Sequence, residues 1–141
     1  MVFAEEMLYP QQHGGKDMKQ IHAPKAPAAL GPYSAAMAYE NLLFCSGQTP
    51  IDPATGSLVE ENIEIQTEQV CKNLAAVLEA AGSSFDKVIK TTCFLSDMGN
   101  FAAFNAVYGK YFTSKPARST VAVKTLPKNA LVEIELIACI G

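Results

Sequence analysis

The sequence predicts an α+β domain in which one mixed sheet carries two helices on a single face. Two segments, residues 65–81 and 101–112, place apolar side chains at helical spacing, so each helix has one buried face. Short apolar runs lie before, between and after them, and the runs between and after them are also rich in β-branched residues, which is typical of strands. Because strands and helices alternate in this way, one sheet covered on one side is the most economical packing.

The strands follow from local patterns. A turn at Glu40-Asn41 separates the first two, and the segment 47–56 is so rich in Gly and Pro that we expect no regular element there. Gly82 should end the first helix, and Asp97 or Asn100 can cap the second. The expected strands are 35–39, 42–46, 88–95, 119–123 and 131–140, with 19–22 as an optional first strand.

The length of 141 residues suits one domain with its own core and is too short for two. Residues 1–17 are interpreted as an N-terminal extension that could be flexible, and the domain as residues 18–141.

No apolar run approaches the roughly 18 residues that span a bilayer. The N-terminal segment carries two Glu and no apolar stretch, so it does not resemble a secretory signal, and we expect a cytoplasmic protein.

Charge and cysteine content exclude several classes of function. The net charge is −3 and no basic cluster is present, which argues against nucleic-acid binding. Four cysteines without a CxxC pair, and only two histidines, argue against a metal site. Cys45, Cys93 and Cys139 lie among apolar residues and are expected to be buried thiols. Thiol catalysis is disfavoured, because His22 is the only candidate base.

The last strand has one apolar face and one mixed face. Val132, Ile134, Leu136 and Ala138 should lie under the helices, whereas Leu131, Glu133, Glu135 and Ile137 point to the other side. A face that mixes charged and apolar groups is unfavourable in open water. We therefore expect a partner subunit to cover it, with Glu133 near the interface.

Two charges stand in strands that do not require them. Arg118 enters the strand after Pro116, and its planar guanidinium matches the two oxygens of a carboxylate. Glu133 follows fifteen residues later and can hold a water molecule or move a proton. Taken singly, each residue is more often a member of a surface ion pair, for example Glu133 with a lysine on a neighbouring strand.

Several segments, in this order and spacing, resemble the RidA family of reactive intermediate deaminases over about residues 19–141. They are Gly31-Pro32-Tyr33-Ser34, Ser46-Gly47-Gln48-Thr49-Pro50 with Asp52-Pro53 and Gly56, Lys90-Thr91-Thr92-Cys93-Phe94-Leu95-Ser96-Asp97-Met98, Phe101-Ala102-Ala103-Phe104-Asn105-Ala106-Val107-Tyr108, Pro116-Ala117-Arg118-Ser119, Leu126-Pro127-Lys128 and Val132-Glu133-Ile134-Glu135.

The resemblance implies a chorismate-mutase-like fold that assembles as a homotrimer with clefts between subunits. It implies a 2-iminobutanoate/2-iminopropanoate deaminase activity, in which enamines and imines such as 2-aminoacrylate and 2-iminopropanoate are hydrolysed to 2-oxo acids and ammonia. It implies no cofactor, and a role in metabolite damage control.

The resemblance also assigns roles to residues. Catalytic roles fall on Arg118, which would hold the substrate carboxylate, on Glu133, which would orient water or relay a proton, and on Tyr33, which would close the cleft. Substrate-binding roles fall on Ser46, Gly47, Phe101, Asn105 and Thr120. Structural alternatives stay open for five of them: the lysine pairing of Glu133 given above, a half-buried tyrosine at 33, a turn glycine at 47, core packing at 101 and a helix-surface role at 105.

The sequence departs from the family pattern at a few positions. Thr120 stands where Cys is common, Thr49 where an aliphatic residue is usual, and Ala35 where Gln is common. These changes bear on substrate preference more than on the reaction class. Three other functions stay open: a non-catalytic trimer that binds 2-oxo acids as a regulator, an RNA-directed activity, which the acidic pI argues against, and a chorismate-mutase-like isomerase, suggested by fold alone.

Overall fold

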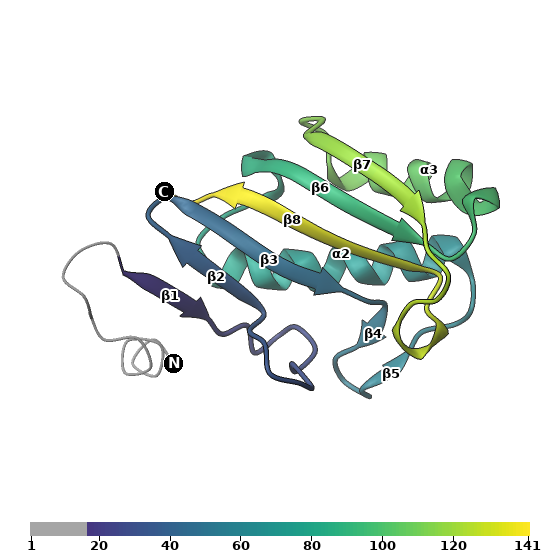
Figure 1. The fold of residues 1–141 in the computed structure, drawn as a ribbon, viewed down its shortest axis with the longest axis horizontal. Coiled ribbons are helices and arrows are strands. Elements are labelled where there is room, and N and C mark those ends of the chain that lie inside the picture. The colour runs from purple at the N-terminus through teal and green to yellow at the C-terminus, as the bar shows by residue number, and fades with distance from the viewer. Residues whose placement is uncertain (1–16) are drawn as a thin grey trace.

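A computed structural model of the chain describes residues 17–141. Six strands form one sheet in the order β1-β2-β3-β8-β6-β7, and only β6 and β7 run parallel (Figure 1). The strands are β1 (Met18–Ile21), β2 (Ala36–Tyr39), β3 (Leu42–Gln48), β6 (Val88–Leu95), β7 (Ala117–Ala122) and β8 (Val132–Cys139). The predicted extension lies outside the described residues, apart from Asp17.

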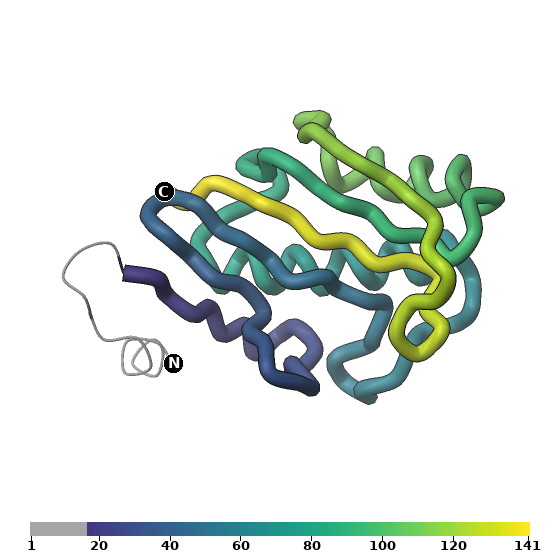
Figure 2. Tube along the Cα trace, in the orientation of Figure 1, coloured from purple at the N-terminus to yellow at the C-terminus, as the bar shows by residue number. Residues whose placement is uncertain are grey.

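Two helices, α2 (Ile63–Ala80) and α3 (Phe101–Tyr111), lie behind the sheet and leave its other face open (Figure 1). The predicted α+β architecture, with one main sheet and both helices on one face, is therefore confirmed. Strand β8 is the last in the sequence, but it lies in the middle of the sheet, between β3 and β6 (Figure 2). The C-terminal segment therefore joins the two parts of the sheet. Short 3-10 turns at Phe85–Lys87, Met98–Asn100 and Pro127–Asn129 connect these elements.

Helix α2 begins two residues before the predicted start. The side chain of Asn62 accepts a hydrogen bond from the backbone N–H of Ile65 at 2.9 Å and so caps the first turn. The helix ends at Ala80, and Gly82 follows with φ of +77°, the left-handed conformation expected of a glycine after a helix. For α3 the capping is indirect: Asp97 caps the preceding 3-10 turn by accepting from Gly99.

The prediction that residues 47–56 contain no regular element is wrong. Strand β3 continues to Gln48, and Ile51–Asp52 (β4) pairs with Ser57–Leu58 (β5) in a small antiparallel hairpin. The Asp52 side chain accepts from the backbone N–H of Ala54 at 2.9 Å, which closes the turn. A two-residue strand is too short to show alternation in the sequence, so the Gly and Pro content dominated the prediction.

The core lies between the sheet and the helices. The inward side chains of β8 (Val132, Ile134, Leu136, Ala138) are all buried, as predicted, against the apolar face of α2. Cys45, Cys71 and Cys93 are buried, and burial raises the pKa of the Cys45 thiol to about 12, so the thiolate is scarce near neutral pH. Cys139 was also expected to be buried, but it is only partly covered, because it stands at the end of β8.

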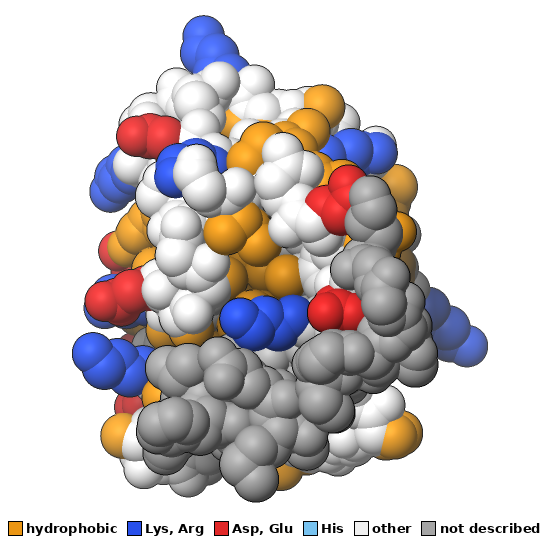
Figure 3. Space-filling model, turned by 90° about the vertical axis from the view of Figure 1, so that its left-hand side faces the viewer, with side chains coloured by type: hydrophobic (Ala, Val, Ile, Leu, Met, Phe, Trp, Pro, Cys, Tyr) orange, Lys and Arg blue, Asp and Glu red, His pale blue; other side chains and the backbone are white. Residues whose placement is uncertain are grey.

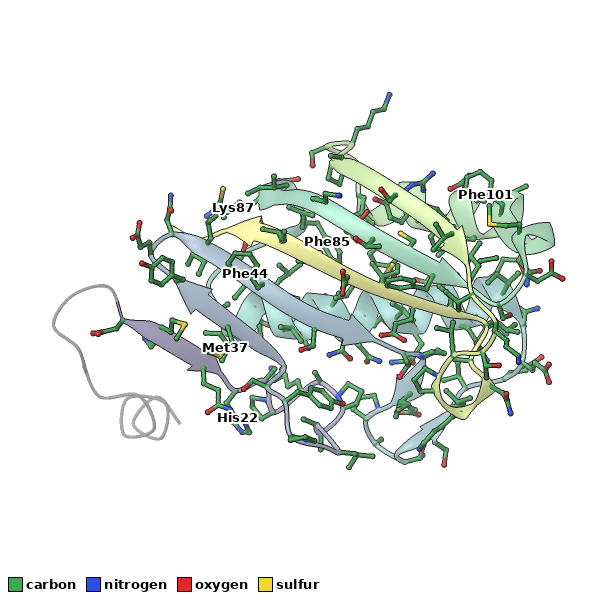
Figure 4. The ribbon with its side chains drawn as sticks, viewed as in Figure 1. His22, Met37, Phe44, Phe85, Lys87 and Phe101 are labelled. Carbon is green, nitrogen blue, oxygen red and sulfur yellow. The ribbon has the colours of Figure 1, made fainter. Side chains whose placement is uncertain are left out.

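The open face of the sheet carries large apolar side chains. Phe44 and Val121 are 43% and 46% exposed, and Figure 4 shows Met37 and Phe44 on the side of the sheet away from the helices. Glu133 and Ile137 are half-buried on this face, and Glu135 is exposed. A face that combines exposed aromatic groups with carboxylates fits the expectation that another subunit covers it.

Two further expectations concern membranes and metals. No helix in residues 17–141 is long and apolar enough to cross a membrane. Within the same residues no cluster of three or more His, Cys, Asp or Glu could hold a metal ion. On the part of the face in Figure 3 that is not grey, basic and acidic side chains are interspersed around exposed apolar groups.

Candidate functional site

Arg118 lies on the helix side of the sheet. In the parallel pairing of β6 and β7 it stands opposite Thr91, which is completely buried beneath α3. One of its terminal nitrogens donates a hydrogen bond to Oδ1 of Asn105 at 2.8 Å. Strand β7 is at the edge of the sheet, so the arginine is held on one side by α3 and remains accessible on the other.

Three aromatic rings of α3 surround the guanidinium. Its central carbon lies 4.8 Å from the ring centroid of Tyr108, 5.5 Å from that of Phe101 and 5.9 Å from that of Phe104. In the described part of the chain Arg118 makes no ion pair with a carboxylate. The cation therefore has neutral partners alone, which leaves its charge available to an anion.

Thr120 lies two residues beyond Arg118 on the same face of β7. Its hydroxyl oxygen is buried and, among residues 17–141, has no hydrogen-bond partner of normal geometry, although the thiol of its register partner Cys93 lies close enough to interact weakly with it. An unsatisfied buried hydroxyl costs about 1–3 kcal/mol, so a group bound beside Arg118 could relieve it. The predicted residues Phe101, Asn105, Arg118 and Thr120 thus form one group, which we call the arginine half-site.

Glu133 belongs to a different cleft, on the open side of the sheet. The cleft has a volume of about 550 Å³, and Tyr33, Ser46, Gly47 and Glu133 all line it. We call these four residues the glutamate half-site. The remaining lining residues are Leu30, Thr49, Ile51, Pro127, Lys128 and Glu135.

Gly47 allows Glu133 to lie across the neighbouring strand. A Cβ added at Gly47 would stand 2.9 Å from Cδ of Glu133 and closer still to its Oε2, so no other residue fits there without displacing the carboxylate. The structure favours this close approach over the simpler alternative of a turn glycine. Burial, and to a lesser extent the negative charge of Glu135, raise the pKa of Glu133 above its ordinary value.

The expected alternative for Glu133, pairing with a lysine, does not occur in residues 17–141. Lys128 reaches the same cleft, but its ammonium group donates to the carbonyl of Gly56 at 3.4 Å. Glu133 is thus a carboxylate without a counter-ion in a partly covered cleft. Such groups are candidates for proton transfer.

Ser46 and Tyr33 shape this cleft from its rim. The hydroxyl of Ser46 donates to the carbonyl oxygen of Ser34 at 2.6 Å, so it braces the loop that carries Tyr33. Tyr33 itself is 55% exposed, more than the half-buried tyrosine of the structural alternative. An exposed ring at the rim of a cleft can cover a ligand bound there.

The two half-sites do not meet within one chain. Arg118 pairs in register with Thr91 of β6, whereas Glu133 pairs with Phe94 of the same strand. Because side chains alternate between faces, positions three apart on β6 point to opposite sides of the sheet. The arginine–glutamate combination expected from the sequence is therefore present as two separate halves, a consequence of strand pairing that sequence spacing alone could not show.

Sequence reasoning missed Tyr108 and Thr91. They touch through their hydroxyl groups at 2.7 Å, directly beneath Arg118. The signal that could have found Tyr108 is its position three residues after Asn105, which places both on one helical face. Thr91 had no comparable signal, since a threonine inside a strand is ordinary.

Comparison with known proteins identifies the family. The family described as Endoribonuclease L-PSP matches residues 23–140, so this chain belongs to it. Putative regulator AldR of Lactococcus lactis is 53% identical over 122 residues, which cover 86% of this chain and 97% of that protein. Reactive Intermediate Deaminase A, chloroplastic, of Arabidopsis thaliana is 50% identical over 119 residues, which cover 84% of this chain and 64% of that protein.

A solved structure points to the same family. The Rid-family protein YyfA of Yersinia pestis has a TM-score of 0.85 and 50% identity to this chain, and the match covers 87% of this chain and 99% of that one. The resemblance to the RidA family that the sequence motifs suggested is confirmed by these matches.

Proposed function

We propose that this protein hydrolyses reactive 2-enamine and 2-imine carboxylates, such as 2-aminoacrylate and 2-iminopropanoate, to 2-oxo acids and ammonia. The main support is the state of Arg118: it is a partly buried cation that makes no ion pair in the described residues, and Asn105 orients it through a hydrogen bond. A guanidinium in this state is a ready binding site for a small carboxylate. The 50% identical deaminase of Arabidopsis supports this reaction class.

The active site forms between subunits. Each chain carries an arginine half-site on one face and a glutamate half-site on the other, and neither contains both groups that the reaction needs. Joining the first of one copy to the second of the next uses two different surfaces, and such a contact forms a ring when the rotation between copies closes. We propose a homotrimer with three clefts, as the RidA resemblance implies.

The chemistry follows from the two charges. Arg118 binds the substrate carboxylate with two parallel hydrogen bonds and fixes the position of the adjacent C=N carbon. A water oxygen forms a bond to that carbon while a proton passes to the nitrogen. The C–N bond of the resulting carbinolamine then breaks, the hydroxyl proton follows the nitrogen, and ammonia leaves behind a 2-oxo acid. An enamine first moves a proton from nitrogen to C3, which gives the imine.

Glu133 serves the water and proton steps. Its raised pKa makes the carboxylate a better proton acceptor than an ordinary glutamate, and its position against Gly47 fixes the direction of the oxygen atoms. Tyr33 covers the cleft from its mouth, and Thr120 offers its unpartnered hydroxyl beside the bound carboxylate. No part of this scheme needs a metal ion or organic cofactor.

A coupled assay tests the proposal. A lyase that acts on serine or cysteine generates 2-aminoacrylate in the cuvette, and ammonia release is followed with wild type, Arg118→Ala and Arg118→Lys. We expect acceleration by wild type, none by the alanine variant, and a large loss in the lysine variant, because a lysine cannot reproduce the bidentate fork. Full activity of Arg118→Ala would refute the assigned role.

A regulatory function is the second candidate, favoured by the 53% identical relative named as a putative regulator. In that case the same arginine binds a 2-oxo acid without turnover. Saturable binding of a 2-oxo acid that depends on Arg118, without acceleration in the coupled assay, would establish this alternative.

A further inference from the structure

The aromatic groups around Arg118 take the place of a counter-ion. A partly buried guanidinium is normally paired with a carboxylate, because removing it from water is costly. Here its partners in the described residues are one amide oxygen, of Asn105, and three aromatic rings. Ring faces stabilise a cation without neutralising it, so this arrangement holds Arg118 in place and keeps its charge for another anion.

Tyr108 is the ring closest to the guanidinium, and its hydroxyl group is held by a hydrogen bond. Its hydroxyl and that of Thr91 are 2.7 Å apart, and the thiol of Cys93 donates to the same threonine oxygen at 3.8 Å. The ring of Phe112 stacks on that of Tyr108, with centroids 4.3 Å apart. Tyr108 is 8% exposed, so these contacts leave its ring one orientation.

The anchor of Tyr108 is tied to Arg118 by the sheet itself. Thr91 is the register partner of Arg118 in the pairing of β6 with β7. The strand pairing therefore fixes the distance between the backbone of the arginine and the hydroxyl that holds the ring beneath it. The series of contacts from Thr91 through Tyr108 to the guanidinium therefore lies within regular strands and a helix and includes no loop.

We propose that Tyr108, locked by its hydrogen bond to Thr91, is a positioning residue that sets the plane of the Arg118 guanidinium for a bound carboxylate. Only the identity of the ligand rests on the proposed function. The rigid placement of an unpaired arginine does not depend on it, so the two claims can be tested apart.

Arg118 is the only arginine in the chain, which makes its side chain directly observable. The guanidinium N–H resonances of a ¹⁵N-labelled protein report the mobility of this one group. We expect restricted rotation in wild type and increased mobility in Tyr108→Leu, with an intermediate effect in Tyr108→Phe and in Thr91→Val. Tyr111→Phe is the matched control: the Tyr111 hydroxyl donates to Glu68 on α2, and its ring is not one of the three that surround Arg118 in the described residues.

Titration with 2-oxobutanoate, a stable 2-oxo acid, measures the consequence for binding. Loss of the ring in Tyr108→Leu should raise Kd about tenfold, in line with a desolvated cation–π contact. Tyr108→Phe and Thr91→Val should each raise Kd roughly threefold, and the double variant should be no worse than either, because both remove one shared hydrogen bond. Tyr111→Phe should bind like wild type.

Different results would contradict the positioning role and the proposed function. Unchanged arginine mobility and unchanged Kd in folded Tyr108→Phe and Thr91→Val would overturn the positioning role, even if Tyr108→Leu does not fold. Fully additive effects of the two substitutions would also overturn the proposed lock. If wild type fails to bind any 2-oxo acid, the proposed function is lost, and the resonances of Arg118 still decide whether Tyr108 and Thr91 hold it.

Discussion

Replacing Gly47 with alanine should displace the Glu133 carboxylate and stop the reaction with little loss of stability. The added Cβ would stand 2.9 Å from Cδ of Glu133, much closer than van der Waals contact allows, and it would be closer still to Oε2. Relief requires the carboxylate to move by about 1 Å, and a misplacement of that size costs roughly 100-fold in rate. Because Glu133 faces an open cleft, its side chain can rotate away, so the cost in stability should stay below about 1–3 kcal/mol.

The measurement is kcat for ammonia release together with thermal unfolding. Gly109→Ala is the matched control, since a Cβ there meets no atom within 4 Å and the residue lies inside α3. That control should keep full activity and gain about 0.5–1 kcal/mol in stability, because alanine favours the helix. Wild-type kcat in Gly47→Ala would refute the assigned place of Glu133.

Three further predictions concern pH and helix capping. The negative charge of Glu135 helps to raise the pKa of Glu133, so Glu135→Gln should move the acidic limb of the pH–rate profile to lower pH, and an unmoved limb would contradict this. Because the pKa of Glu133 is raised in the folded state, the protein loses stability as pH rises from the ordinary glutamate pKa of 4.5 through the raised value. Glu133→Gln should therefore be more stable than wild type at pH 7 but not at pH 4. Asn62→Ala removes the cap of α2 and should cost about 1 kcal/mol in unfolding free energy, measured in urea; no change in the midpoint would show that another group caps the helix.

The sequence predicted the elements well where a long period was present. Alternation along β8 showed which side chains would be buried, and helical spacing located α2 and α3, because both patterns extend over many residues. The β4–β5 hairpin escaped prediction, because two-residue strands carry no period and depend on the Asp52 turn and tertiary contacts. Asn73 of α2, for example, donates to the carbonyls of Thr49 and Ile51 and fixes this hairpin from a distant part of the chain.

The candidate site was predictable as a set of residues but not as an arrangement. Family motifs named Arg118 and Glu133, yet which face each occupies depends on the pairing of both strands with β6. The buried contact of Tyr108 with Thr91 likewise depends on packing between a helix and a strand, and no local sequence pattern predicts it. The sequence thus specifies the chemistry of the groups, whereas their separation into two half-sites emerges only from the fold.

Complementation between two inactive variants tests the central claim most directly. Arg118→Ala lacks one half-site and Glu133→Gln the other, so each homo-oligomer should be inactive. When the two are co-expressed in equal amounts, random assembly gives about a quarter of the interfaces an intact arginine from one copy and an intact glutamate from its neighbour. We predict that ammonia release returns to about a quarter of the wild-type rate. A mixture as inactive as its two components would contradict a site shared between subunits.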